Sequence, residues 1–445
     1  MKAKQIDRRD FLAKSSMGLI GAGIGFSNSI GTDGKYFMDT NTEEPKIKEY
    51  RILGRTGFKV SDIGCGSIGT SNENVIKALI SGGVNLIDTA EDYANGNNER
   101  MVGRAIKSFQ RKSLFINTKV SVSKDETKEG LVLRIKKCLE RLDTGYIDGL
   151  MIWNASSVSE VKNKVFHQAF QQLRKDGLVK YSGISCHGSN WDEAPGETME
   201  KIVGAAATDG RFDIVLFVHN YVQKEMGEII LKECAKKNIG TLLMKTDPFG
   251  GNYLSIVEMV KSYNNEKKPV PENYQKIYDQ IIERQIKAES FLRKDQLFNT
   301  NAKREAAISF ALSNSSVHSA LITFKNFDDV TNYINLSGIR LKEKILTMIN
   351  SLKENYGDMY CRHACNACES KCPYKVPVNR IMRYNHYFMA QSREKYAIEK
   401  YHDLKGSNAK ICKNCEGYCE ASCPYSVKIQ GLLAIAHNNL SLNIS

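Results

Sequence analysis

Long apolar runs are missing from this sequence, because no stretch approaches the roughly eighteen residues that a membrane-spanning helix requires. We therefore expect a protein that does not span a membrane. Nucleic-acid-binding motifs are also missing, although the formal net charge is +13. Since lysines and arginines are spread along expected helices, we predict no nucleic-acid partner, while an acidic or membrane-surface partner stays open. With 42% hydrophobic and 25% charged residues, the composition argues against wholesale disorder.

A twin-arginine pattern stands near the N-terminus. Arg8 and Arg9 precede a weakly apolar, glycine-rich stretch in "DRRDFLAKSSMGLIGAGIGFSNS". This order is typical of a twin-arginine export signal, which we place at residues 1–30, followed by a polar linker at 31–48. No cysteine follows the apolar stretch, so a lipid anchor is not indicated. We predict a periplasmic or otherwise exported protein, and a chance arginine pair in a basic tail is the alternative.

Short apolar segments alternate with amphipathic helical patterns between residues 49 and 345. Eight of them are predicted strands, at 60–66, 84–90, 114–120, 146–153, 180–185, 212–218, 240–245 and 319–324. Such alternation means parallel pairing through crossovers, and eight strands favour a closed α/β structure, the (β/α)8 TIM barrel. An open doubly wound sheet would want a glycine-rich phosphate turn after its first strand, and "CGSIGTSNEN" matches that poorly. Residues 252–300 are too many for an ordinary connection and are expected to form an inserted helical segment.

Polar residues stand at the expected carboxyl ends of these strands, where the chemistry of a barrel belongs. Asp88 ends the second strand, Tyr93 follows in "DTAEDYANGNNE", and Lys119 lies in "INTKV". Together with "RILGRTGFKVSDIGCGSIG", these blocks resemble the aldo-keto reductases over roughly residues 49–345. The resemblance implies that Tyr93 is the acid/base, that Lys119 lowers the pKa of its phenol, and that Asp88 holds the lysine. It also implies a small-molecule carbonyl or alcohol as substrate; a purely structural ion pair is the alternative for Asp88.

The sequence departs from this family at two places. The family ends its fourth strand with a pattern similar to D-x-x-x-x-H, and the same count from Asp148 reaches Trp153. Trp153 is therefore the fourth residue of the predicted catalytic set. An indole N–H donates one hydrogen bond but cannot accept one or carry charge. Tryptophan is also much larger than histidine, so we expect a narrower or differently shaped pocket. At the cofactor site, Cys186 and Leu216 replace an asparagine and a glutamine that are frequent in the family. The resemblance still implies NADP(H) binding, by Gly66, Ser67, Ser185, Asn220, Lys245, Lys325 and Asn326.

Eight of the twelve cysteines lie in two short runs, C-x3-C-x2-C-x3-C-P and C-x2-C-x3-C-x3-C-P. Each run resembles the bacterial ferredoxin pattern with one extra residue. Zinc ribbons do not require the C-P ending, and neighbours this close cannot all form unstrained disulfides, so we favour two [4Fe–4S] clusters over both alternatives. Two-cluster ferredoxins exchange the fourth cysteine, which implies one cluster on Cys361, Cys365, Cys368 and Cys423 and the other on Cys412, Cys415, Cys419 and Cys372.

The two cysteine runs define a second domain at residues 346–445. A subset of aldo-keto reductase-like proteins carries a small ferredoxin-like domain there, and "CESKCPYKVPVNRIMRYN" resembles theirs. The twin-arginine route moves folded proteins, so clusters could be inserted before export. The sequence thus predicts an exported iron–sulfur oxidoreductase that acts on a carbonyl or alcohol and exchanges electrons with a redox protein partner. The alternative is a barrel without hydride chemistry that serves as a substrate-binding or scaffold module for the electron-transfer domain.

Overall fold

The computed structural model describes residues 45–188, 197–248, 260–272, 274–276, 278–280, 282–283, 300–363, 365–390, 393–404 and 406–441. The predicted export signal and residues 31–44 of the predicted linker lie outside this part of the chain. So do residues 252–259 and 284–299 of the predicted inserted segment. None of the described helices combines the length and the apolarity that a membrane crossing needs.

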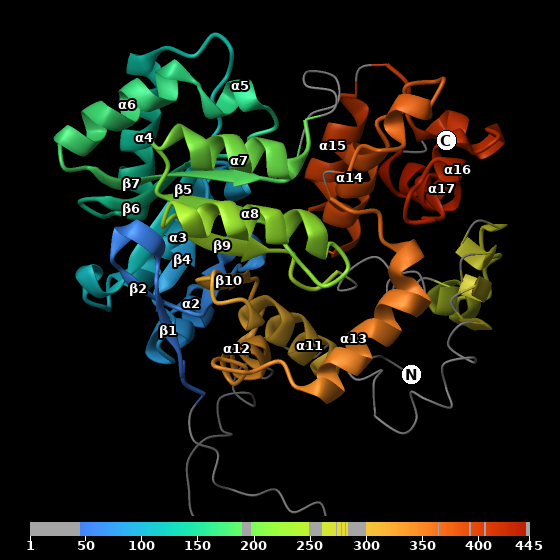
Figure 1. Ribbon diagram of the computed structural model, residues 1–445, viewed down its shortest axis with the longest axis horizontal. Coiled ribbons are helices and arrows are strands. Elements are labelled where there is room, and N and C mark those ends of the chain that lie inside the picture. The colour runs from blue at the N-terminus through green and yellow to red at the C-terminus, as the bar shows by residue number, and fades with distance from the viewer. Residues whose placement is uncertain are drawn as a thin grey trace, which may run out of the picture. The chain divides into compact units, whose positions relative to one another are not determined.

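Eight parallel strands close into a barrel in the order β10-β3-β4-β5-β6-β7-β8-β9, with helices outside the ring (Figure 1). All eight predicted strands are present, which confirms the predicted α/β barrel. The strands are β3 (Ile63–Gly66), β4 (Leu86–Asp88), β5 (Phe115–Val120), β6 (Ile147–Ile152), β7 (Val179–Cys186), β8 (Ile214–Val218), β9 (Gly240–Met244) and β10 (Ser319–Ile322).

Several helices around the barrel begin at a side-chain cap. In α4 (Lys128–Leu142), Thr127 accepts a hydrogen bond from Gly130 N, and the apolar face of the helix is buried against the strands. The other helices of this layer are α2 (Glu73–Ser81), α3 (Asn97–Ile106), α5 (Val158–Val161), α6 (Lys164–Lys175), α7 (Met199–Asp209), α8 (Lys224–Lys236), α11 (Thr300–Ser313) and α12 (Phe327–Ile334). Of these, α2, α5, α6 and α12 also begin at a side-chain cap.

The amino end of the barrel is filled by apolar side chains. Inward-facing residues such as Leu86, Phe115 and Met151 form an interior core, and the hairpin of β1 (Tyr50–Ile52) and β2 (Lys59–Ser61) adds Val60 to it. Phe58 packs edge-on against Phe115 with ring centroids 5.4 Å apart. Because this end is packed with side chains, space for a ligand remains at the carboxyl ends of the strands.

The region after the barrel combines helices with irregular loops, and its described residues include no strand. It contains α13 (Glu343–Tyr356), α14 (Val378–Ala390), α15 (Glu394–His402), α16 (Tyr418–Ala421) and α17 (Ile429–Leu440). Its core continues into the barrel loop after β8, where Tyr221 and Val222 join the same apolar cluster. Next to them, Gln223 Nε2 donates to His363 O at 2.6 Å and His363 N donates to Gln223 Oε1 at 2.8 Å. These paired hydrogen bonds hold the C-terminal region to the carboxyl end of the barrel.

Candidate active site

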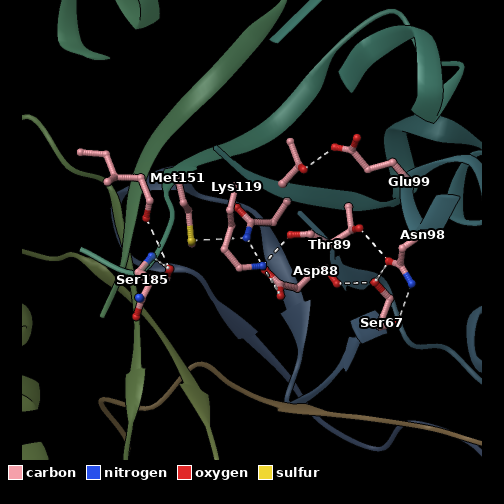
Figure 2. Close-up of polar contacts among 12 residues, drawn as sticks. Ser67, Asp88, Thr89, Asn98, Glu99, Lys119, Met151 and Ser185 are labelled. Atoms are coloured by element: carbon pink, nitrogen blue, oxygen red, sulfur yellow. Dashed lines mark hydrogen bonds and ion pairs between the residues drawn. The ribbon is translucent and has the colours of Figure 1, made fainter. Parts of the chain in front are cut away.

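A buried ion pair lies at the carboxyl ends of β4 and β5. Lys119 Nζ is 2.6 Å from Asp88 Oδ2 and also donates to Thr89 O at 2.5 Å, as Figure 2 shows. Side chains alternate along a strand, so Asn117 lies on the same side of β5 as Lys119 and donates to the other oxygen of Asp88. The two charged side chains are only 2% and 5% exposed. Burial raises the pKa of Asp88 and lowers the pKa of Lys119, and the attraction between them opposes both shifts.

Tyr93 follows β4 and begins a tight turn, η3 (Tyr93–Gly96). Ala94 and Asn95 adopt left-handed backbone angles, φ 50° and 53°, and Gly96 continues at φ 80°. Two non-glycine residues in this region strain the backbone, which is common where a turn positions a functional side chain. The Tyr93 ring is 8% exposed, and its centroid lies 4.9 Å from Lys119 Nζ.

The pKa of Tyr93 differs from the expectation that Lys119 lowers it. Burial, followed by the nearby Asp88 carboxylate, raises the pKa of the phenol well above its ordinary value, while Arg393 opposes the rise. The physical reason is that Asp88 is hydrogen-bonded to Lys119 and offsets its charge at the phenol. The geometry therefore keeps Tyr93 protonated at neutral pH.

Trp153 directly follows β6, and its backbone N–H donates to Val120 O at 2.8 Å. Its ring stands edge-on to Tyr93, with centroids 6.1 Å apart and an interplanar angle of 85°. This edge-to-face arrangement is a favourable aromatic geometry, and it places the indole against Tyr93 at the side of the site. His187, next to it, is held by a 2.7 Å hydrogen bond between Nδ1 and Asn154 Oδ1.

A cavity of about 710 Å³ opens above these residues, a size typical of small-molecule sites. Asp88, Tyr93, Lys119 and Trp153 all line it, so the structure brings the four predicted catalytic residues together. Other barrel residues line it as well, and one wall comes from the C-terminal region, with Arg380, Arg383, Tyr384 and Tyr387 on α14, then Arg393, Tyr396 and Lys400. Sequence reasoning missed this wall. The available signal was the spacing of Arg380 and Arg383, which puts both on one face of a helix.

Of the seven predicted cofactor residues, Gly66, Ser185 and Lys245 line the cavity. Ser67 instead donates to Asp88 O at 2.8 Å and pairs with Asn98 (Figure 2). Asn220 is fully buried, and the side-chain amide makes its hydrogen bonds within the protein. It accepts from the backbone N–H groups of residues 222 and 223, and it donates to Lys245 O and to the Tyr360 hydroxyl. These two side chains thus have structural roles here.

Lys325 and Asn326 are exposed at the start of α12 and do not line the cavity. Asn326 caps this helix by accepting from Asp329 N at 2.9 Å, and Asp329 accepts from Lys325 N at 2.9 Å. Asp328 and Asp329 both lie in the first turn of α12. Because carboxylates there already complement the helix dipole, this helix end is poorly suited to a phosphate.

The two cysteine runs fold alike. In the first, Asn379 Nδ2 donates to the carbonyl of Arg362 at 2.6 Å and to that of Cys365, while Asn379 N donates to Glu369 Oε1 at 2.7 Å. In the second, Gln430 Nε2 donates to the carbonyls of residues 412 and 415, while Gln430 N donates to the Glu420 carboxylate at 3.0 Å. Asn379 and Gln430 each follow the last cysteine of their run by the same number of residues. The runs are therefore an internal structural repeat.

The eight thiols of the runs gather in two groups, and each group takes one cysteine from the other run. Burial raises the pKa of Cys361, and the nearby thiolates of Cys365, Cys368 and Cys423 add to the rise. The second group lines one small cavity of about 10 Å³ and comprises Cys372, Cys412, Cys415 and Cys419. All twelve cysteines are free thiols. As placed, the described residues contain no group of three or more histidine, cysteine or acidic side chains that could hold a metal ion.

The four other cysteines, Cys65, Cys138, Cys186 and Cys234, are buried in the core of the barrel. Burial raises the pKa of Cys65, Cys186 and Cys234 to about 12, so they stay protonated and unreactive at neutral pH.

Two curated proteins are similar to part of this chain. An uncharacterised oxidoreductase of Bacillus subtilis, YqkF, is 32% identical over 149 residues, which cover 30% of this chain and 48% of the relative. A candidate voltage-gated potassium channel subunit beta of Schizosaccharomyces pombe is 34% identical over 165 residues, covering 32% and 46%. This chain spans about half the length of these curated relatives.

The fold and the sequence point to one family. The holo form of the aldo-keto reductase AKR11C1 from Bacillus halodurans superimposes with a TM-score of 0.51 at 19% identity, covering 68% of this chain and 96% of that one. This likeness concerns the fold alone. The model of the aldo/keto reductase family matches residues 69–354, which is more than half of the chain. The chain therefore belongs to the aldo/keto reductase family.

Proposed function

We propose that this protein is an exported oxidoreductase that reduces a carbonyl compound in the cavity above Tyr93, and that its C-terminal region binds two [4Fe–4S] clusters. The observation that carries the catalytic part is the Asp88–Lys119 pair, buried beneath the Tyr93 ring at the wall of a cavity large enough for a substrate. Family membership supports the reaction class.

The chemistry of the site follows from its hydrogen bonds. Reduction of a carbonyl leaves negative charge on oxygen, which needs a proton donor in a place that excludes water. The Tyr93 phenol, which is protonated at neutral pH, is that donor. As the proton leaves, Lys119 stabilises the phenolate, and Asp88 with Thr89 O holds the ammonium group in place. Burial raises the pKa of the phenol and makes it a weaker acid, so proton transfer depends on this stabilisation by Lys119.

NADP(H) is the hydride source that the family suggests, and when bound it supplies a hydride to the carbonyl carbon. Gly66, Ser185 and Lys245 line the cavity and would hold the nucleotide at the barrel mouth. Ser67, Asn220, Lys325 and Asn326 are engaged elsewhere or lie outside the cavity. An exported enzyme meets little free nucleotide, so the proposal includes tight retention of it.

Two [4Fe–4S] clusters would be held by Cys361, Cys365, Cys368 and Cys423, and by Cys372, Cys412, Cys415 and Cys419. Three observations support this donor set: the repeated loop structure, the grouping of four thiols, and backbone N–H groups directed at sulfur. Val376 N donates to Cys372 Sγ at 3.5 Å, and Gly417 N donates to Cys415 Sγ at 3.4 Å. When bound, such clusters supply one-electron transfer to a redox protein partner.

Export by the twin-arginine route is proposed from Arg8 and Arg9 and the apolar stretch that follows them. It agrees with the cysteine usage, because a route for folded proteins permits cofactor insertion first. Changing both arginines to lysine should leave the protein in the cytoplasm, whereas unchanged periplasmic recovery would contradict the proposal.

The catalytic proposal is tested by Tyr93→Phe. With NADPH and 4-carboxybenzaldehyde as probes, this variant should lose roughly 10²- to 10⁴-fold in kcat, as removal of a proton donor does. Tyr146→Phe is the matched control, because Tyr146 lies at the amino end of β6 between Arg111 and Lys180. Equal kcat in the Tyr93→Phe variant and the parent would contradict the proposal.

A second candidate function is a binding or scaffold barrel without hydride chemistry. It is favoured by Trp153, which stands edge-on to Tyr93 where the family has a histidine, and by Asn220, whose amide is fully used within the protein. This alternative expects no NADPH binding by the purified protein and no difference between the parent and the Tyr93→Phe variant in any activity.

A further inference from the structure

We propose that the substrate of this site carries an anionic group, a carboxylate or a phosphate, and that Arg383 and Arg393 of the C-terminal region bind it. This inference rests on the proposed function and adds a substrate class to it. The two arginines, with Tyr387 and Tyr396, are called the basic wall below.

Arg393 is held in place by aromatic rings. Its Cζ lies 3.9 Å from the centroid of Tyr396 and 5.5 Å from that of Tyr387. A guanidinium stacked in this way is attracted to the ring faces and keeps its N–H edges available to a ligand. The same Cζ lies 6.0 Å from the centroid of Tyr93. A charged donor is thus fixed beside the proposed proton donor.

Arg383 carries a donor that has no acceptor. Its side chain lines the cavity, and its Nε is buried without a hydrogen-bond partner among the described residues. A buried charged donor is costly when its hydrogen bond is not made, and an anionic ligand would make it. Lys245 lines the same cavity, and its Nζ lies 5.1 Å from the centroid of the Tyr387 ring and 3.3 Å from His363 Nδ1.

The charges around the cavity leave an excess of cations. Eight basic and three acidic side chains line it. Asp88 is paired with Lys119, and Glu91 with Arg134. The third carboxylate, Asp92, is exposed and lies near Arg393 and Lys400, whose charges oppose the rise of its pKa. Arg141 is paired with Glu99 outside the cavity, and burial beside Arg383 and Arg393 lowers the pKa of Lys245. The cations that remain are those of the C-terminal region, Arg380, Arg383, Arg393 and Lys400. A cavity with this imbalance raises the local concentration of anions.

The position of the basic wall favours the substrate over the phosphates of a dinucleotide. A carbonyl that is protonated by Tyr93 must lie against that residue, and Arg393 is next to it. Arg393 therefore reaches a group only a few bonds from the reacting carbonyl. Bidentate contact between guanidinium and a carboxylate or phosphate also orients the substrate, which is how a binding residue affects the rate.

The experiment uses the full chain and a pair of probes that differ in one charge, 4-carboxybenzaldehyde and its methyl ester. Trp153 lines the cavity, so its fluorescence reports binding, with Trp191→Phe as the background that removes the other tryptophan. The variants are Arg393→Gln, Arg383→Gln and Arg393→Lys. The control is Lys395→Gln, a loss of the same charge on the same helix as Lys400, from a side chain that is 91% exposed.

We expect the carboxylate probe to bind the parent at least tenfold more tightly than the ester. Arg393→Gln and Arg383→Gln should remove this preference, Arg393→Lys should keep part of it, and Lys395→Gln should keep all of it. Equal binding of both probes to the parent overturns the proposal, as does an equal loss in the Lys395→Gln variant. So does a result in which the arginine variants weaken NADPH binding but leave the carboxylate probe unchanged, since the arginines would then serve the dinucleotide.

These outcomes separate the inference from the proposed function. Arginine-dependent binding of the carboxylate probe without any turnover would sustain the anionic site and refute the reductase. Turnover of both probes with the same KM, abolished by Tyr93→Phe, would sustain the reductase and refute the anionic site. Circular dichroism of each variant checks that it is folded, and Arg393→Lys provides a second test if Arg393→Gln is not.

Discussion

Replacement of Lys119 by methionine gives the sharpest test of the buried site, because it removes one charge of a pair and little volume. Asp88 would then remain buried with one hydrogen bond, from Asn117. Removal of one partner of a buried pair typically costs about 3–5 kcal/mol. Here the free-energy cost has an upper limit, because the Asp88 carboxyl can bind a proton and become neutral.

The upper limit of this free-energy cost depends on pH. An unfolded aspartate has a pKa of about 3.9, so a carboxyl that must be neutral in the fold costs at most about 4 kcal/mol at pH 7 and about 1.5 kcal/mol at pH 5. In the Lys119→Met variant the pKa of Asp88 is raised above its unfolded value. The folded state therefore binds the extra proton, and its stability falls as pH rises from 4 to 7. The penalty should be larger at pH 7 than at pH 5 by up to about 2.7 kcal/mol.

Urea unfolding of the full chain, followed by far-ultraviolet circular dichroism at pH 5, 6 and 7, measures this penalty. The matched control is the double variant Asp88→Asn with Lys119→Met, which has no buried charge left and should lose the extra pH dependence. A penalty for Lys119→Met that is equal at pH 5 and pH 7 would show that Asp88 takes up no proton when its partner is removed. A penalty below about 1 kcal/mol at pH 7 would show that the carboxylate reaches water.

Two further perturbations test the packing around β8 and α8. Burial lowers the pKa of His219 from its ordinary value of 6.5 to about 4, so the unfolded chain takes up the proton first as pH falls. The contribution of His219 to the free energy of unfolding should be complete above pH 6.5 and should be lost between pH 6.5 and 4, by at most about 3 kcal/mol. In an acid titration of the unfolding free energy, a His219→Gln variant should lack this loss. A side chain at Gly227 would overlap the His219 ring, so Gly227→Ala should destabilise the protein by about 1–3 kcal/mol in urea unfolding. Gly204→Ala in α7 meets open space and should instead stabilise it by about 0.5–1 kcal/mol; the same sign for both variants would contradict the described packing.

The barrel and its central pair were predictable because their signals are local and periodic. Apolar strands at regular intervals specify the closed sheet, and alternation along β5 places Lys119 and Asn117 on the side that faces Asp88. The role of Asn220 was harder to see, since its side chain accepts from backbone N–H groups two and three residues later, a turn that a single asparagine does not reveal.

The basic wall could not be predicted, because it depends on contacts far apart in the sequence. Arg393 lies near Tyr93 because the C-terminal region packs on the barrel, through a shared apolar cluster and the hydrogen bonds between Gln223 and His363. A helix face that carries two arginines is ordinarily exposed to solvent. Only the tertiary structure turns this one toward a cavity.

The iron and acid-labile sulfide content of the full chain, purified without oxygen, tests most directly whether the reductase barrel is joined to an iron–sulfur region. We expect about eight iron and eight sulfide per chain, with an electron paramagnetic resonance signal after reduction. Cys372→Ser should lower both counts, whereas Cys234→Ser, which removes a core thiol, should not. Zinc in place of iron, or no labile sulfide in the parent protein, would show that the two cysteine runs hold no [4Fe–4S] clusters.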